Sequence, residues 1–460
     1  MTIRKTKVIG FLFLTTFLVQ SVFGQITQSS VRTHLEFLAS DAMQGRGSGT
    51  EFEKLAGMYL GAMMQQFGVE PAALKGGYLQ TVEIARTVVT GTSLNIASTN
   101  GSVSLEAGKD FVPLRISSFF RGPIKKLGAN ELPNSGDVVF INWKNTDDQQ
   151  GAMQRLQSLS KYGVAGIIVE ETEQWKASWA ALSARRQSFT TIEGVKNEGL
   201  NIIVVNKSVA DRLTSLPIGA FADFNGTTGE AQKQFTWNAV GKLTGSDPRM
   251  KDEAILLSAH MDHLGVRQSV PGIDKIFNGA DDDASGCVAV LELAKVLAAG
   301  KKPKRTVYFA FFGSEEAGGF GSQHFVATLP FPKDKLIANL QFEMLGRPDS
   351  KVGADELWLT GYERSNLGAE LARRGAKLVA DPHPDQNFFQ RSDNYTLARQ
   401  GIVAHTVSSF GLHKDYHQAS DEFGTIDLNH MTRSIESMVV PVRWLANSTF
   451  RPEWVPGKKP

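Results

Sequence analysis

The chain contains a single cysteine, Cys287, among its 460 residues. One thiol cannot form an internal disulfide, so packing or bound metal must hold the fold together. Cys287 lies in an apolar run, Cys287-Val-Ala-Val-Leu-Glu-Leu-Ala. We therefore expect a small buried side chain at this position rather than a reactive nucleophile.

An excess of charge of one sign is also missing. The 49 Lys and Arg residues nearly balance the 47 Asp and Glu residues, and the net charge is +2. Binding to nucleic acid or to anionic lipid normally depends on a basic surplus. We therefore expect no nucleic-acid partner.

No hydrophobic run reaches the roughly 20 residues that a membrane-spanning helix needs. The run at residues 8–19 follows three basic residues within positions 4–7 and precedes small residues at positions 22 and 24. This pattern is typical of a secretory signal peptide. It predicts that residues 1–24 are removed, and that the mature chain is exported to the periplasm or the extracellular space without stable membrane insertion.

Two common hydrolase signatures are absent. The chain has no Gly-x-Ser-x-Gly motif, which disfavours a serine hydrolase, and no His-Glu-x-x-His motif of the thermolysin type. Residues 112–235 contain no histidine at all, and short alternating strands are predicted there at 137–142, 164–170 and 200–205. The pattern predicts a small β-rich accessory domain, inserted between two parts of a larger domain at residues 25–111 and 236–460.

The remaining chain has the pattern of an α/β domain. Helical spacing of apolar residues covers residues 29–70, with a tight turn at 45–50. After residue 236, strands alternate with helices, which predicts a mostly parallel sheet covered on both faces. The predicted strands are 254–258, 306–311, 337–342, 356–360 and 402–407, with a helix at 285–299.

Acidic and histidine side chains follow these strands where each strand ends. Ligands bind at the carboxyl ends of strands in open α/β sheets, so we expect these side chains to converge. Imidazole and carboxylate ligands suit Zn²⁺, and three carboxylates with a bridging hydroxide would balance two zinc ions. The residues are His260 and Asp262, Asp282 before the predicted helix, Glu315 and Glu316, Glu343, and His417.

These blocks resemble the co-catalytic zinc metallopeptidase family, which includes bacterial leucyl aminopeptidase, aminopeptidase Y and glutamate carboxypeptidase. The resemblance covers nearly the whole mature chain, from Leu38-Ala-Ser-Asp-Ala-Met-Gln-Gly-Arg46 to Ser392-Asp-Asn-Tyr395. It implies a three-layer αβα catalytic domain. The segment Lys161-Tyr-Gly-Val-Ala-Gly-Ile-Ile-Val169 resembles the protease-associated domain that is often inserted in this family.

The resemblance also implies a role for each site residue. Asp282 would bridge two zinc ions, with His260 and Glu343 completing one ion and Glu316 and His417 the other. Glu343 stands where many members have aspartate. The three residues expected to act in catalysis are Glu315 as general base, Asp262 as the acid that orients His260, and Tyr416 as a donor to the oxyanion. Asp281 and Asp283 are expected to shape the turn, and His263 and His324 to be structural.

The function that the resemblance implies is an exported zinc aminopeptidase that hydrolyses N-terminal peptide bonds of peptide substrates with metal-activated hydroxide. Two alternatives remain open at this point. A carboxypeptidase or dipeptidase could use the same scaffold, and a receptor-like binding protein could keep the fold without catalysis.

Overall fold

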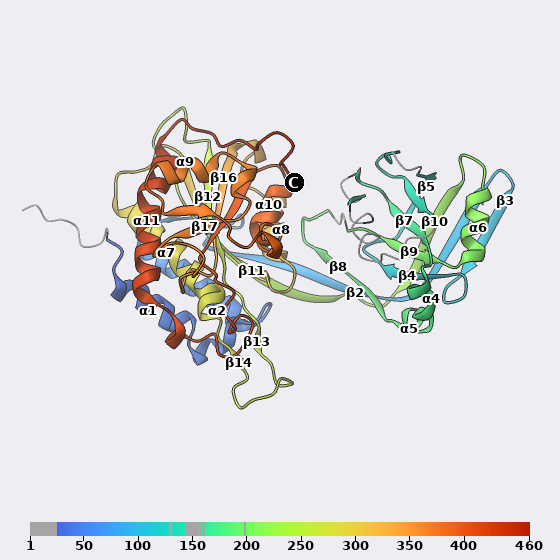
Figure 1. The fold of residues 1–460 in the computed structure, drawn as a ribbon, viewed down its shortest axis with the longest axis horizontal. Helices are drawn as coiled ribbons and strands as arrows, with labels where there is room; N and C mark the ends of the chain where they lie inside the picture. The colour runs from blue at the N-terminus through green and yellow to red at the C-terminus, as the bar shows by residue number, and fades with distance from the viewer. Residues whose placement is uncertain (1–24, 128–130, 143–155, 157, 160–161, 197–198) are drawn as a thin grey trace, which may run out of the picture.

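The computed structural model describes every residue except 1–24, 128–130, 143–155, 157, 160–161 and 197–198. The predicted signal peptide lies outside the described residues. The chain forms two lobes that are connected by long strands (Figure 1). None of the helices in the described part of the chain has the length and apolar character needed to cross a membrane.

The larger lobe is built on a mostly parallel sheet. Its central strands are, in order, β15 (Thr306–Phe312), β12 (Ala254–His260), β16 (Leu336–Phe342) and β19 (Val403–Ser408). All residues of these strands are buried, as expected for continuous apolar runs that are covered on both faces. Antiparallel β11 (Gln232–Leu243) borders β15, and β17 (Leu357–Leu359) and β18 (Leu378–Ala380) extend the sheet beyond β19.

Helices cover both faces of this sheet. Alternate strand residues such as Ile255 and Leu257 pack against one set of helices, and Leu256 packs against the other. The first set is α1 (Gln28–Leu38), α2 (Glu51–Gln66), α7 (Gly286–Ala299), α9 (Leu367–Arg373) and α11 (Leu428–Asn447). The second is α8 (Phe320–Ala327) and α10 (Asp393–Arg399). The predicted three-layer αβα fold class is confirmed.

The predicted elements of this lobe correspond closely to those observed. The five predicted strands are β12, β15, β16, β17 and β19, and the predicted helix at 285–299 is α7. Cys287 is buried on α7, as expected. Threonine side chains cap α1 and α2, and a 3₁₀ helix, Asp41–Arg46, with a turn separates them, as the glycines at 45–50 predict.

The smaller lobe is rich in β-structure. It contains a parallel set of strands in the order β5, β6, β7 and β9, and β2 pairs with β3, β8 and β10. Predicted strands 137–142, 164–170 and 200–205 correspond to β6, β7 and β9. The elements are β3 (Gly101–Glu106), β4 (Phe111–Arg115), β5 (Phe120–Lys126), β6 (Val138–Ile141), β7 (Gly166–Glu170), α4 (Glu173–Ala177), α5 (Trp179–Ala184), β8 (Gln187–Ile192), β9 (Ile202–Val205), α6 (Lys207–Ser215) and β10 (Phe221–Thr228).

Two long paired strands, β2 and β11, connect the lobes (Figure 1). β2 (Leu79–Ser98) pairs with the sheet of the larger lobe through β11 and continues into the smaller lobe (Figure 1). Leu94, Ile96 and Leu105 belong to the hydrophobic core of the smaller lobe. That core therefore includes residues upstream of position 112, where the sequence placed the start of the insert.

Candidate metal centre

The predicted ligands lie together at the carboxyl ends of the parallel strands. His260 is the last residue of β12, Glu343 follows β16, and Glu316 follows β15 by four residues. Asp282 lies in the turn that leads into α7, and His417 in the loop after β19. The topology thus brings residues more than 150 positions apart to one edge of the sheet, as the pattern of strand ends predicts.

The first group of possible metal ligands is His260, Asp282 and Glu343. One ligand atom from each lies within 4.8 Å of the other two. The Nε2 atom of His260 is 3.2 Å from Oδ1 of Asp282. His260 and Asp282 are almost completely buried.

The second group contains Asp282, Glu316 and His263. His417 adjoins this group, because its Nε2 atom is 3.2 Å from Oδ2 of Asp282 and 3.2 Å from Oε1 of Glu316. The two oxygens of Asp282 therefore face different groups, Oδ1 toward His260 and Oδ2 toward His417. This is the arrangement of a carboxylate that can bridge two metal ions.

His263 was expected to be structural, but it lies directly in the second group. Its Nδ1 atom is 3.0 Å from Oε1 of Glu316 and 3.8 Å from Oδ2 of Asp282. Neither ring nitrogen has a hydrogen-bond partner among the described residues, although the side chain is fully buried. Its position three residues after His260 is the one sequence signal that could have identified it. His324 lies instead on α8, where its Nδ1 atom is 2.6 Å from the carbonyl oxygen of Glu193.

Glu315 lies beside the two groups without belonging to either. Burial raises the pKa of its carboxyl well above the ordinary value, and Asp393, Glu343 and Glu316 add to that effect. Burial opposes ionisation of Asp282 as well, but contacts with His260 and His417 hold its pKa well below the ordinary value. The centre thus holds the strongly ionised carboxylate of Asp282 near the carboxyl group of Glu315, which readily takes a proton.

Asp262 contacts the Glu315–Glu316 turn more closely than it contacts His260. Its carboxylate accepts hydrogen bonds from the backbone N–H of Glu315 at 2.9 Å and of Glu316 at 3.2 Å. It also accepts one from the Ser48 hydroxyl at 2.5 Å. The distance from its Oδ1 to Nδ1 of His260 is 3.8 Å, and the carbonyl oxygen of Asp262 is nearer to that nitrogen, at 3.1 Å.

Tyr416 covers the outer side of the centre. Its ring stacks on His417, with the ring centroids 3.9 Å apart and an angle of 22° between the planes. Its hydroxyl accepts a hydrogen bond from Arg391 at 3.2 Å. Burial raises the pKa of this hydroxyl, so it stays protonated and able to donate.

Three buried charged residues that had no predicted role hold the loops of the centre. Arg46 donates to the carbonyl oxygens of residues 38, 261, 278 and 279. Glu53 accepts hydrogen bonds from the backbone N–H of Ser314 and the Thr236 hydroxyl, both at 2.7 Å. Asp421 accepts from the backbone N–H groups of residues 281 and 282. Single charged residues in a sequence carry no sign of such contacts.

The comparisons with known proteins agree with this geometry. Residues 238–440 match the model of peptidase family M28. Leupeptin-inactivating enzyme 1 of Streptomyces exfoliatus is 32% identical over 229 residues, covering 46% of this chain and 49% of that protein. A "Probable zinc metalloprotease" of Pyrenophora teres f. teres is 37% identical over 203 residues, covering 38% of this chain and 42% of that protein. This chain thus spans less than half the length of these relatives.

A solved structure has the same fold. The aminopeptidase from Aneurinibacillus sp. strain AM-1 superposes with a TM-score of 0.50 at 17% identity, covering 94% of this chain and 97% of that one. The resemblance to the zinc peptidases that the sequence predicts is confirmed. The part of the chain that matches peptidase family M28, residues 238–440, is also the part that carries the site.

Proposed function

We propose that this chain is an exported zinc aminopeptidase with two metal ions in its active site. The observation that carries the proposal is the pair of ligand groups that share Asp282. Two similarities support it: residues 238–440 match a family of peptidases, and one relative is a probable zinc metalloprotease.

The residues present fit zinc. Both ring nitrogens of His263, Oε1 of Glu316 and Oε2 of Glu343 are buried without a hydrogen-bond partner among the described residues. Such buried polar atoms are costly unless something satisfies them, and a divalent cation does so. Imidazole and carboxylate without thiolate is a ligand set that suits zinc. His260, Asp282 and Glu343 would hold one ion, and Asp282, Glu316, His417 and His263 surround the place of the other.

Bound zinc supplies Lewis-acid activation of water and of the scissile carbonyl. In this proposal, Glu315 takes the proton from the attacking water and delivers it to the leaving amine. Proton transfer of this kind is worth about 10²–10⁴-fold in rate. Asp262 positions Glu315 through its backbone N–H, and the Tyr416 hydroxyl donates a hydrogen bond to the developing oxyanion.

A pocket beside Glu343 supports an apolar preference for the N-terminal side chain. Five apolar or aromatic residues line it, Met344, Trp358, Phe388, Phe410 and Tyr416. Apolar side chains gain about 25 cal/mol for each Å² that they bury, so these residues favour an apolar side chain over a charged one.

The position of Arg391 favours a second candidate function, that of a carboxypeptidase. It lines the same pocket and donates to the Tyr416 hydroxyl, so it could pair with the C-terminal carboxylate of a peptide. Because aminopeptidases need a free amine and carboxypeptidases a free carboxylate, substrates that are blocked at one end separate the two functions.

The test measures hydrolysis of a leucyl chromogenic substrate and of peptides blocked at either end. We expect cleavage of the C-terminally amidated peptide and none of the N-acetylated peptide, with activity lost on chelation and restored by zinc. Glu315→Gln serves as the inactive reference. Cleavage of the N-acetylated peptide alone would establish the carboxypeptidase, and hydrolysis that survives complete removal of metal would contradict the proposal.

A further inference from the structure

A large cleft lies between the two lobes, next to the metal centre. Its volume is about 960 Å³, at the upper end of the range for ligand-binding cavities. The smaller lobe contributes β8 and residues 114–117, and the larger lobe contributes α8 and α10. Gly318, only two residues beyond Glu316, lies in its wall, so the cleft adjoins the turn that carries Glu315.

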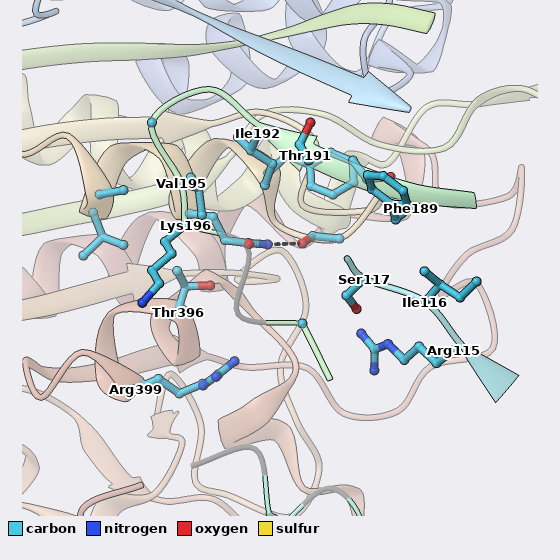
Figure 2. A pocket seen from close by; sticks show the side chains of 18 of the residues that line it. Arg115, Ile116, Ser117, Phe189, Thr191, Ile192, Val195, Lys196, Thr396 and Arg399 are labelled. Atoms are coloured by element: carbon cyan, nitrogen blue, oxygen red, sulfur yellow. Dashed lines mark hydrogen bonds between the residues drawn. The ribbon is translucent and has the colours of Figure 1, made fainter. Parts of the chain in front are cut away.

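The lining of this cleft is strongly basic. It includes five cationic side chains, and no carboxylate occurs among its described lining residues. The five are Arg115, Arg185, Lys196, Lys333 and Arg399. Figure 2 shows Arg115 on strand β4 and Arg399 on helix α10 extending toward one another, with Lys196 from the loop after β8 on the Arg399 side.

These cations have few partners inside the protein. Lys333 donates to the side chain of Gln400, but no ion pair joins any of the five to a carboxylate within the described part of the chain. The nearby Glu193 lies 3.7 Å from Lys75 instead. Unpaired like charges around one cavity repel one another, and a ligand that carries carboxylates would remove that repulsion.

A strand edge runs along the same cleft. All six residues of β8 line it, whereas a strand that faced the cavity with one side would contribute alternate residues only. β8 pairs with β2, and no residue pairing joins its outer edge to another described strand. Backbone N–H and C=O groups on such an edge can pair with an extended peptide.

The wall that carries this edge is fixed to the larger lobe. The residues that follow β8 contact α8, because His324 Nδ1 is 2.6 Å from the carbonyl oxygen of Glu193. A side chain added at Gly194 would approach Thr328 to 2.9 Å, so the loop lies close against the same helix. The edge of β8 therefore keeps its position relative to the metal centre.

We propose that this cleft binds an extended, acidic segment of the peptide substrate, downstream of the scissile bond. The peptide backbone pairs with the outer edge of β8, and its Asp or Glu side chains reach Arg115, Lys196 and Arg399. The ligand's role as substrate rests on the proposed aminopeptidase function. The cleft would then favour peptides with acidic residues after the N-terminal residue.

A binding measurement tests the cleft independently of catalysis. The probe is an N-acetylated, fluorescent octapeptide with three Glu residues, which an aminopeptidase does not cleave, compared with the same peptide carrying Gln. Exposed charge pairs contribute a few-fold each, so we expect about tenfold tighter binding of the Glu peptide at low salt. High salt should remove the difference, and amide exchange at residues 187–192 should slow when the peptide binds.

Paired variants locate the effect. Arg115→Gln combined with Arg399→Gln should abolish most of the preference, whereas Lys251→Gln with Lys301→Gln, two exposed lysines outside the cleft, should keep it. Both double variants should hydrolyse the leucyl chromogenic substrate like the wild type. Equal binding of Glu and Gln peptides, an equal loss in both double variants, or equally tight binding of a short oligonucleotide would overturn the cleft proposal. Failure of the wild type to hydrolyse the chromogenic substrate would instead overturn the proposed function.

Discussion

Arg46 offers a sharp test of how the metal centre is held. Its side chain is completely buried, and its guanidinium donates four hydrogen bonds of 2.6–3.0 Å to backbone carbonyl oxygens. Three of the acceptors are Met261, which follows His260 at the end of β12, and Asn278 and Gly279, which lead into the turn with Asp282. We predict that Arg46→Met destabilises the protein and loosens both segments.

The magnitude follows from the acceptors that lose their partner. A buried polar group left unsatisfied costs about 1–3 kcal/mol. The carbonyl oxygen of Gly279 still accepts from the backbone N–H of Ala284, so three carbonyl oxygens are counted, and we expect a loss of at least about 3 kcal/mol in unfolding free energy. Arg46→Lys should recover only part of this loss, because an ammonium group lacks the planar fork of a guanidinium.

The assay is chemical denaturation of the zinc-loaded protein, with metal content measured alongside. Arg32→Met is the matched control, because Arg32 is exposed and contacts only the carboxylate of Glu36 and the ring face of Phe423 among the described residues. It should change the unfolding free energy by less than about 1 kcal/mol. An Arg46→Met protein as stable as the control, with its zinc content unchanged, would refute the reasoning.

Three further predictions concern single side chains. Glu315→Ala should keep both ions but lose about 10²–10⁴-fold in kcat, and full activity would remove Glu315 from the mechanism. His263→Ala should weaken zinc binding at the Glu316 side by about 10–100-fold in a chelator titration, while His324→Ala should not; equal affinities would return His263 to a structural role. Burial lowers the pKa of His405 to about 4, and between pH 6.5 and 4 the unfolded chain therefore binds a proton that the folded one does not. The stability of the wild type relative to His405→Asn should fall by up to about 3 kcal/mol across that window, whereas a constant difference would contradict the assignment.

The sequence predicts the larger lobe well because its signals are local. Continuous apolar runs such as 306–311 form strands that are buried on both faces, and Gly300 ends α7 as predicted. The site could be predicted for a related reason. Parallel strands place their carboxyl ends at one edge, so His260, Glu316 and Glu343 meet although they are far apart in sequence.

The missed features depend on contacts that no local pattern encodes. His263 takes its place beside Glu316 only because the chain turns after β12. The core of the smaller lobe includes Leu94 because strand β2 continues from one lobe into the other. The boundary between the lobes therefore lies inside one strand, and the composition and periodicity of that strand do not change there. The basic cleft likewise joins Arg115 and Arg399, which are nearly 300 residues apart.

Metal analysis of the purified protein tests the central claim most directly. We predict two zinc ions per chain in the wild type. In Asp282→Asn both ions should bind more weakly, because Asp282 belongs to both ligand groups. A crystal of the zinc-loaded protein should show anomalous scattering at both groups. A wild-type protein that holds no zinc under saturating conditions, or an Asp282→Asn protein that binds two ions as tightly as the wild type, would contradict it.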